Sequence, residues 1–111
     1  MRVELLYTPD YPGYMTARQN LVEVLTEDAF ETPIQMIAVS SPGDAEFLGF
    51  PGSPTIRMDG QDIYPEGAHG IGTGLRRYPP DGGGPPSTVP SKSLIRSAVE
   101  RARGWSHGRR A

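Results

Sequence analysis

The apolar and turn-forming residues of this chain alternate in a way that predicts four short strands and three helices. Runs rich in β-branched and other apolar residues predict strands at residues 2–7, 33–39, 55–58 and 61–64. Three- and four-residue apolar spacing predicts helices at residues 12–27, 44–49 and 91–104. The order β-α-β-α-β-β-α predicts an α/β sandwich, with helices flanking a four-stranded mixed sheet.

The signals at the element ends fix the directions of the strands. A strand, helix and strand in succession require a right-handed crossover and two parallel strands. Asp59-Gly60 is a strong hairpin signal, so the third and fourth strands are expected to be antiparallel. Asp10 is placed to cap the first helix, and Pro12 is tolerated in its first turn.

The predicted helices and strands each contribute apolar residues to one expected core. The first helix carries an apolar stripe at three- and four-residue spacing, formed by Tyr14, Ala17, Leu21, Val24 and Leu25. We expect one core to contain Leu21, Leu25, Ile37, Ile56, Ile95 and Val99.

The length of 111 residues suits one compact domain, expected at residues 1–104 and followed by a basic C-terminal tail at 105–111. Glycine and proline, at 14 and 12 residues, are concentrated in residues 65–90, where no periodic pattern persists. A loop of this length is uncommon inside a compact domain. It is therefore expected to be functional, partly disordered or host to a short hidden element.

Charge and composition exclude several classes of function. The net charge of −2 argues against a domain that neutralises nucleic-acid phosphates. The chain has neither a run of about 18 apolar residues nor a signal-peptide pattern, so we expect a cytoplasmic protein without a membrane segment. The absence of cysteine excludes disulfide exchange, thiolate nucleophiles and cysteine-bound metal centres.

Two segments carry a resemblance to the thioredoxin-like superfamily over residues 3–104. The turn Pro9-Asp10-Tyr11-Pro12-Gly13-Tyr14 stands where that family has Cys-x-x-Cys, with Tyr11 and Tyr14 at the cysteine positions. Gly52-Ser53-Pro54-Thr55-Ile56 resembles the family's cis-proline segment, which implies a cis Ser53–Pro54 bond next to the Tyr11 turn.

Residues 48–64 are more narrowly similar to small bacterial, often actinobacterial, thioredoxin-like proteins, some of which are labelled alkylmercury-lyase-like. Leu75-Arg76-Arg77-Tyr78 matches the Cys-Arg-x-Tyr segment of that group except at the cysteine. Because every expected sulfur position is vacant, thiol–disulfide exchange and carbon–mercury cleavage are not expected. The resemblance therefore implies a fold and no redox activity.

The turn formed by Asp10, Tyr11, Pro12, Gly13 and Tyr14 is the first candidate ligand site. It precedes a helix whose unpaired N–H groups and dipole favour an anion or a polarised oxygen. The phenol of Tyr11 could donate a hydrogen bond to a ligand, stabilise a thiolate or act as an acid. The alternative is that Tyr11 and Tyr14 only fill the space of a degenerate site.

Two further segments contain candidate ligand-binding residues. Ser53, Pro54 and Thr55 could offer backbone groups to an extended peptide or to a glutathione-like thiol, or could simply begin the third strand. Arg76 and Arg77 could hold a carboxylate or phosphate, although a solvated loop is the favoured interpretation.

These observations predict a redox-inactive module that binds a partner peptide, a small thiol or an anion. They leave open whether the chain forms a homodimer. The alternative is a cysteine-independent enzyme of glutathione-transferase-like or isomerase-like type, in which Tyr11 or Tyr14 stabilises a thiolate or enolate and Asp10 orients it. No cofactor and no metal are expected. A site combining His69 with Asp59, Asp62 or Glu66 is less favoured than an ordinary solvated hairpin.

Overall fold

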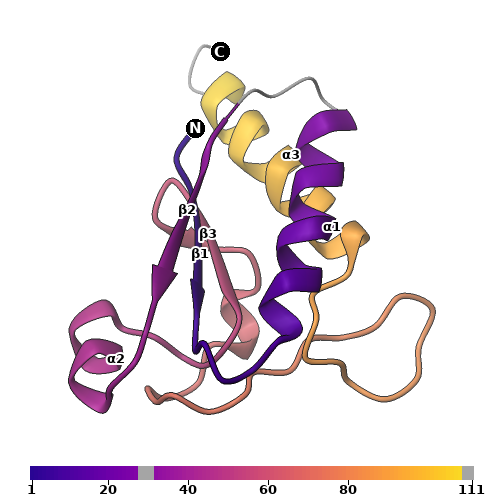
Figure 1. The fold of residues 1–111 in the computed structure, drawn as a ribbon. Coiled ribbons are helices and arrows are strands. Elements are labelled where there is room, and N and C mark those ends of the chain that lie inside the picture. The colour runs from indigo at the N-terminus through magenta and orange to yellow at the C-terminus, as the bar shows by residue number, and fades with distance from the viewer. Residues whose placement is uncertain (28–31, 109–111) are drawn as a thin grey trace.

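The computed structural model describes residues 1–27 and 32–108, with side chains up to residue 103. Its elements in chain order are β1 (Val3–Tyr7), α1 (Gly13–Glu27), β2 (Ile34–Ala38), α2 (Pro42–Leu48), β3 (Thr55–Met58), β4 (Gln61–Asp62), the 3-10 helix η1 (Pro65–Gly67) and α3 (Lys92–Gly108) (Figure 1). The predicted α/β class with a four-stranded mixed sheet is confirmed.

The sheet has the strand order β2-β1-β3-β4. β1 runs parallel to β2 and antiparallel to β3, and β4 is antiparallel to β3. The central strand β1 contributes Val3, Leu5 and Leu6, which are all buried. A strand between two neighbours with helices on both faces must be apolar on both faces, which is why β1 lacks strict polar alternation.

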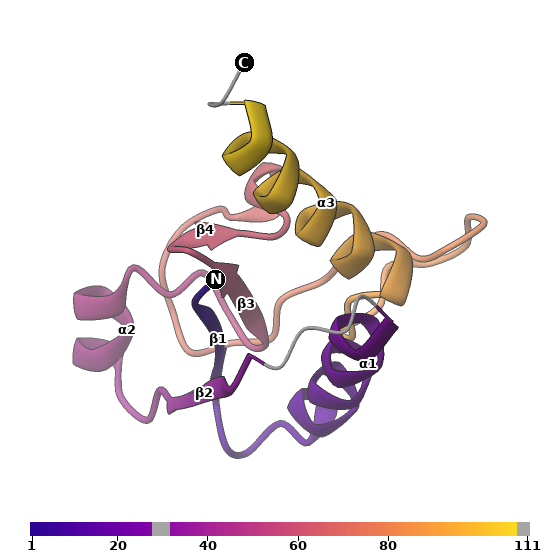
Figure 2. The same ribbon diagram turned by 90° about the horizontal axis from the view of Figure 1, so that it is seen from above.

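The helices are divided unequally between the two faces of the sheet. α1 and α3 cover one face and α2 lies at the other (Figure 2). The larger core, on the α1 and α3 face, includes Leu21, Leu25, Ile56, Ile95 and Val99, as predicted. A smaller cluster on the α2 face consists of Leu6, Val39, Ala45 and Phe50.

The prediction that Ile37 shares the larger core is wrong. Ile37 packs against the smaller cluster, whereas Ile34 packs against the larger one. Side chains alternate between the faces of a strand, so residues separated by three positions point in opposite directions. Two apolar residues of β2 thus serve different cores.

Two predicted helix boundaries are also wrong. α2 begins at Pro42, two residues early, because the Ser41 hydroxyl accepts the N–H of Asp44 at 3.1 Å and caps the helix. α3 continues to Gly108 instead of ending at Gly104. One glycine inside a helix costs only about 1 kcal/mol, so it does not oblige the helix to stop. Residues 109–111 of the expected tail lie outside the described residues.

The glycine- and proline-rich segment contains the short element η1 and two isolated bridges. Ser53 pairs with Leu75 in parallel orientation, and Tyr78 pairs with Ser87 in antiparallel orientation. These pairings tie the segment to the start of β3 and fold its second half back on itself. The segment predicted as one loop therefore divides into parts with different surroundings.

Candidate functional site

The turn between β1 and α1 brings the first candidate residues to the end of the sheet where β1 finishes. The N–H of Tyr11 donates to the Thr8 carbonyl at 3.0 Å, which closes the turn. α1 begins at Gly13, so Pro12 stands before its first turn and Asp10 lies at an exposed corner. The predicted cap by Asp10 is therefore wrong, because the Thr8–Tyr11 turn places this residue too early.

Thr8 joins three segments that are far apart in sequence. Its N–H donates to Ser53 Oγ at 2.9 Å, and its hydroxyl donates to the Thr73 carbonyl at 3.2 Å. Both Thr8 and Ser53 are buried, so these hydrogen bonds are shielded from competing water. The β1–α1 turn is consequently held against the proline loop and the glycine-rich segment.

The Ser53–Pro54 bond is cis, as the resemblance implied. The Ser53 N–H donates to the Gly74 carbonyl at 2.8 Å, and the Ser53 carbonyl accepts the Arg76 N–H at 2.8 Å. Thr55 lies in β3, paired with Leu6 of β1. The Ser53 backbone is therefore not open to a peptide, because the chain's own segment already pairs with it, whereas ligand contact at Pro54 or Thr55 stays a prediction.

The two tyrosines of the turn have different surroundings. The Tyr14 ring stacks on the Tyr7 ring with their centroids 4.2 Å apart, and it packs against the larger core. Tyr11 is half-buried. The space-filling role proposed as the alternative thus describes Tyr14, although Tyr14, like Tyr11, is only half-buried.

Residues 88–90 lie beside the N-terminal half of α1. A Cβ added to Gly13 would lie 3.6 Å from Thr88 Oγ1 and 3.7 Å from Val89. About two turns along the helix, Asn20 Nδ2 donates to the Pro90 carbonyl at 3.1 Å. The helix start is therefore flanked by the proline loop and by the end of the glycine-rich segment.

Arg76 occupies a position that neither sequence interpretation foresaw. Only 3% of its surface is exposed. Its two terminal nitrogens donate to the Asp62 carboxylate at 2.7 and 3.0 Å, and one of them also donates to the Tyr64 carbonyl at 2.6 Å. Arg76 is thus neither solvated nor free to hold a ligand, because it already binds an internal carboxylate. Arg77, by contrast, is exposed.

Tyr78 completes this buried group beside the proline loop. Its hydroxyl donates to the Pro54 carbonyl, and the Arg76 guanidinium lies 4.8 Å from the centre of its ring. Burial raises the pKa of Tyr78 above its ordinary value near 10 because the phenolate would be poorly solvated. Sequence reasoning missed Asp62 and Tyr78 as partners of Arg76, although the Arg-Arg-Tyr motif contained one of them.

The acidic residues of the hairpin do not gather around His69. Among the side chains of residues 1–27 and 32–103, no group of three or more from His, Cys, Asp and Glu is arranged to hold a metal ion. Asp62, one of the ligands considered, is engaged by Arg76 and also accepts the Tyr64 N–H at 2.7 Å. The Asp62 carboxylate therefore already accepts hydrogen bonds from two residues of the chain itself.

Comparison of the chain with models of protein families, with curated proteins and with solved structures gave no match. Within the described part of the chain, none of the helices has both the length and the apolar character required to cross a membrane. The functional interpretation therefore depends on the geometry of the residues themselves.

Proposed function

We propose that this protein is a redox-inactive binding module with a thioredoxin-like fold, and that its ligand site is the β1–α1 turn. The cis Ser53–Pro54 bond and its place beside the turn support the thioredoxin-like interpretation. The chain has no cysteine, so any function at this turn is independent of a thiol of its own.

The observation that carries the proposal is the way in which Thr8 fixes the turn. Its two hydrogen bonds, to Ser53 and Thr73, hold the turn between two other segments before any ligand arrives. A site organised in advance loses less conformational entropy when it binds. Such a rigid turn at a helix start is suited to a small ligand.

The polar groups at the turn favour an anion or a thiolate as that ligand. The N–H groups of Gly13 and Tyr14 belong to the first turn of α1, where a helix provides no internal acceptors. The positive end of the helix dipole is located there as well. The partly accessible phenol of Tyr11 adds a hydrogen-bond donor, which makes Tyr11 the residue whose hydroxyl should matter most.

A small ligand is favoured over an extended peptide because of the pairing of Ser53. A peptide strand would need the N–H and carbonyl that Ser53 shares with Gly74 and Arg76. A small anion at the helix start needs neither group. We therefore assign to this site a low-molecular-weight thiol or anion.

The proposal is tested by thermal unfolding in the presence of reduced glutathione, oxidised glutathione, acetate and inorganic phosphate. A ligand that binds only the folded state at a hundred times its Kd adds about 2.7 kcal/mol of stability. We expect at least one of these compounds to raise the Tm of the parent and to have a smaller effect on Tyr11→Phe.

Tyr64→Phe is the matched control, because Tyr64 is also half-buried but follows β4 instead of β1. Its ligand response should equal that of the parent. The proposal is wrong if none of the four compounds shifts the Tm, or if Tyr11→Phe and Tyr64→Phe respond equally to every compound that does.

A further inference from the structure

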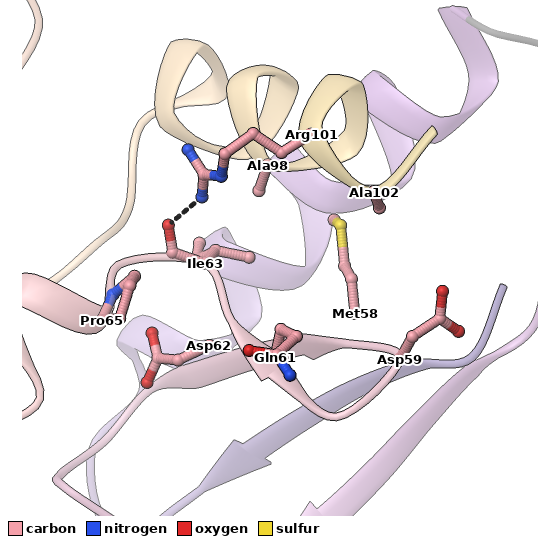
Figure 3. A pocket seen from close by; sticks show the side chains of 9 residues that line it. All are labelled: Met58, Asp59, Gln61, Asp62, Ile63, Pro65, Ala98, Arg101 and Ala102. Carbon is pink, nitrogen blue, oxygen red and sulfur yellow. Dashed lines mark hydrogen bonds between the residues drawn. The ribbon is translucent and has the colours of Figure 1, made fainter. Parts of the chain in front are cut away.

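A hollow lies at the opposite end of the sheet from the β1–α1 turn. It has a volume of about 640 Å³ and opens between the β3–β4 hairpin and the C-terminal half of α3 (Figure 3). The Asp59 N–H at its edge donates to the Arg2 carbonyl, just before β1 begins, whereas Thr8 follows the end of β1. The two sites are therefore separated by the length of the strand.

The walls of this hollow are mainly apolar. Met58 and Ile63 of the hairpin, with Ala98 of α3, are almost fully buried members of the larger core, so the base of the hollow is the core itself. Ala98 and Ala102 are one helical turn apart and face the hairpin (Figure 3). Two short side chains leave space there that a longer side chain would fill.

Arg101 gives the hollow a positive charge at one end. One terminal nitrogen donates to the Ile63 carbonyl at 2.9 Å, which holds the side chain over the hairpin. A guanidinium has five N–H donors, so this hydrogen bond leaves others for a ligand. The Asp62 carboxylate does not compete for them because it binds Arg76.

The hollow has two carboxylates in its lining, of which Asp62 is paired with Arg76 and Asp59 lies away from Arg101. In Figure 3, Asp59 and Arg101 stand at opposite ends of the group, with Met58 between them. Asp59 Oδ1 accepts the Arg2 N–H at 2.7 Å and is thus directed toward the chain start. A ligand lying along the apolar wall would meet a cation at one end only.

We propose that this hollow binds a small apolar monocarboxylate, with its carboxylate on Arg101 and its hydrocarbon part against Met58, Ile63 and Ala102. The volume is within the range of about 300 to 1,000 Å³ that is typical of small-molecule sites. Apolar walls with a small number of charged groups, here Arg101, Asp59 and Asp62, are also typical of such sites. This site does not depend on the function proposed for the β1–α1 turn.

Isothermal titration calorimetry of the full chain with octanoate tests the proposal. We expect saturable binding at one site. Arg101→Gln should weaken octanoate binding by about tenfold or more, because a hydrogen bond to a charged group is lost. Octan-1-ol, which lacks the charge, should bind the parent more weakly than octanoate and should bind Arg101→Gln as it binds the parent.

Filling the hollow should abolish binding of both compounds. Ala102→Phe extends a side chain from α3, and Gln61→Trp does so from the exposed side of β4, which provides a second variant if the first fails to fold. Arg18→Gln removes an exposed arginine of α1, away from the hollow, and should leave binding unchanged. The proposal is overturned if the parent does not bind octanoate, if Arg101→Gln binds it equally well, or if a folded filling variant retains it.

Discussion

Two parts of the glycine- and proline-rich segment, the docked half at residues 72–78 and the open half at residues 79–86, differ in both composition and structure. The docked half is held to the residues just before β3: the Gly72 N–H donates to the Phe50 carbonyl at 3.0 Å, and the backbone of Gly74 and Arg76 pairs with Ser53. Residues 79–86 are exposed except for the half-buried Pro80. The docked half includes two arginines and a tyrosine, whereas the open half consists of glycine, proline and one aspartate, so the two parts differ in the side chains that can reach a partner.

The difference between the halves comes from Arg76 and Tyr78. Both side chains are almost completely buried, and between them they bind Asp62 and the Pro54 carbonyl. Burying a charged group is unfavourable unless it is paired and hydrogen-bonded, as Arg76 is here. Two long polar side chains thus attach one half of the segment, and the other half has no equivalent.

Removing the carboxylate partner of Arg76 should have the largest effect on the docked half. Asp62→Ala leaves a buried guanidinium without its counterion, and loss of one partner of a buried pair costs about 3 to 5 kcal/mol. The free energy of unfolding, measured in urea, should fall by that amount. Glu23→Ala, which removes an ion pair to Lys92 in which both side chains are 43% exposed, should cost no more than about 1 kcal/mol.

A methyl group at Gly52 should push against the backbone of the docked half at Gly74 and Arg76. A Cβ there would lie 3.0 Å from Arg76 Cβ and 3.2 Å from the Gly74 carbonyl oxygen, in a residue with φ of +133°. Backbone strain and overpacking together predict a loss of about 2 to 5 kcal/mol for Gly52→Ala. Gly72→Ala meets open space and should show a much smaller change in the same urea titration.

Loss of one hydroxyl from the docked half should have an intermediate effect. Tyr78→Phe keeps the buried ring but leaves the Pro54 carbonyl without this donor. An unsatisfied buried acceptor costs about 1 to 3 kcal/mol. Tyr11→Phe, at a half-buried phenol, provides the comparison; an equally large loss there would contradict a special role for the Tyr78 hydroxyl.

Alkaline pH should weaken the docked half through the same residue. The raised pKa of Tyr78 keeps it protonated in the folded state, whereas the unfolded state releases the proton near pH 10. The contribution of Tyr78 is therefore fully present below pH 10 and is lost as the pH rises above it, by about 1.4 kcal/mol per pH unit. Urea unfolding between pH 9 and 11 should show this decline in the parent relative to Tyr78→Phe; parallel profiles would contradict it.

The open half should tolerate the greatest change in sequence. A Cβ added to Gly82, Gly83 or Gly84 would meet no atom within 4 Å, so shortening the segment disturbs no packing there, although φ values of +71°, +90° and +101° favour glycine at these positions over any other residue. Deleting the three residues shortens an exposed loop, and halving a loop changes its closure free energy by only about 0.6 kcal/mol. The Tm should therefore change little, whereas a loss as large as that of Asp62→Ala would show that the open half also packs.

Most of the regular elements could be predicted because their signals are local. The stripe from Ala17 to Leu25 defines α1 by its spacing, and Asp59-Gly60 defines the turn between β3 and β4. The three-residue separation of Ile34 and Ile37 shows that their side chains lie on opposite faces of the sheet. It does not show which of the two faces the larger core, because that depends on the register of β2.

The docked segment could not be predicted because its contacts are distant in sequence. Asp62 lies 14 residues before Arg76, and Pro54 lies 24 residues before Tyr78. No helix or strand period connects these pairs, and a guanidinium in a glycine-rich run is most often exposed. At the candidate site, the Tyr11 turn and the cis bond were foreseen, but the pairing of Ser53 with the chain itself was not.

The pairing of Ser53 with residues 74–76 makes this segment an internal competitor for any extended peptide at the same edge. A peptide could bind only those molecules in which the segment has been displaced, so its apparent Kd would exceed the intrinsic Kd by the inverse of that fraction. The ion pair between Arg76 and Asp62 helps to hold the segment in place and so helps to set the fraction. In a folded molecule, weakening the pair would therefore strengthen peptide capture.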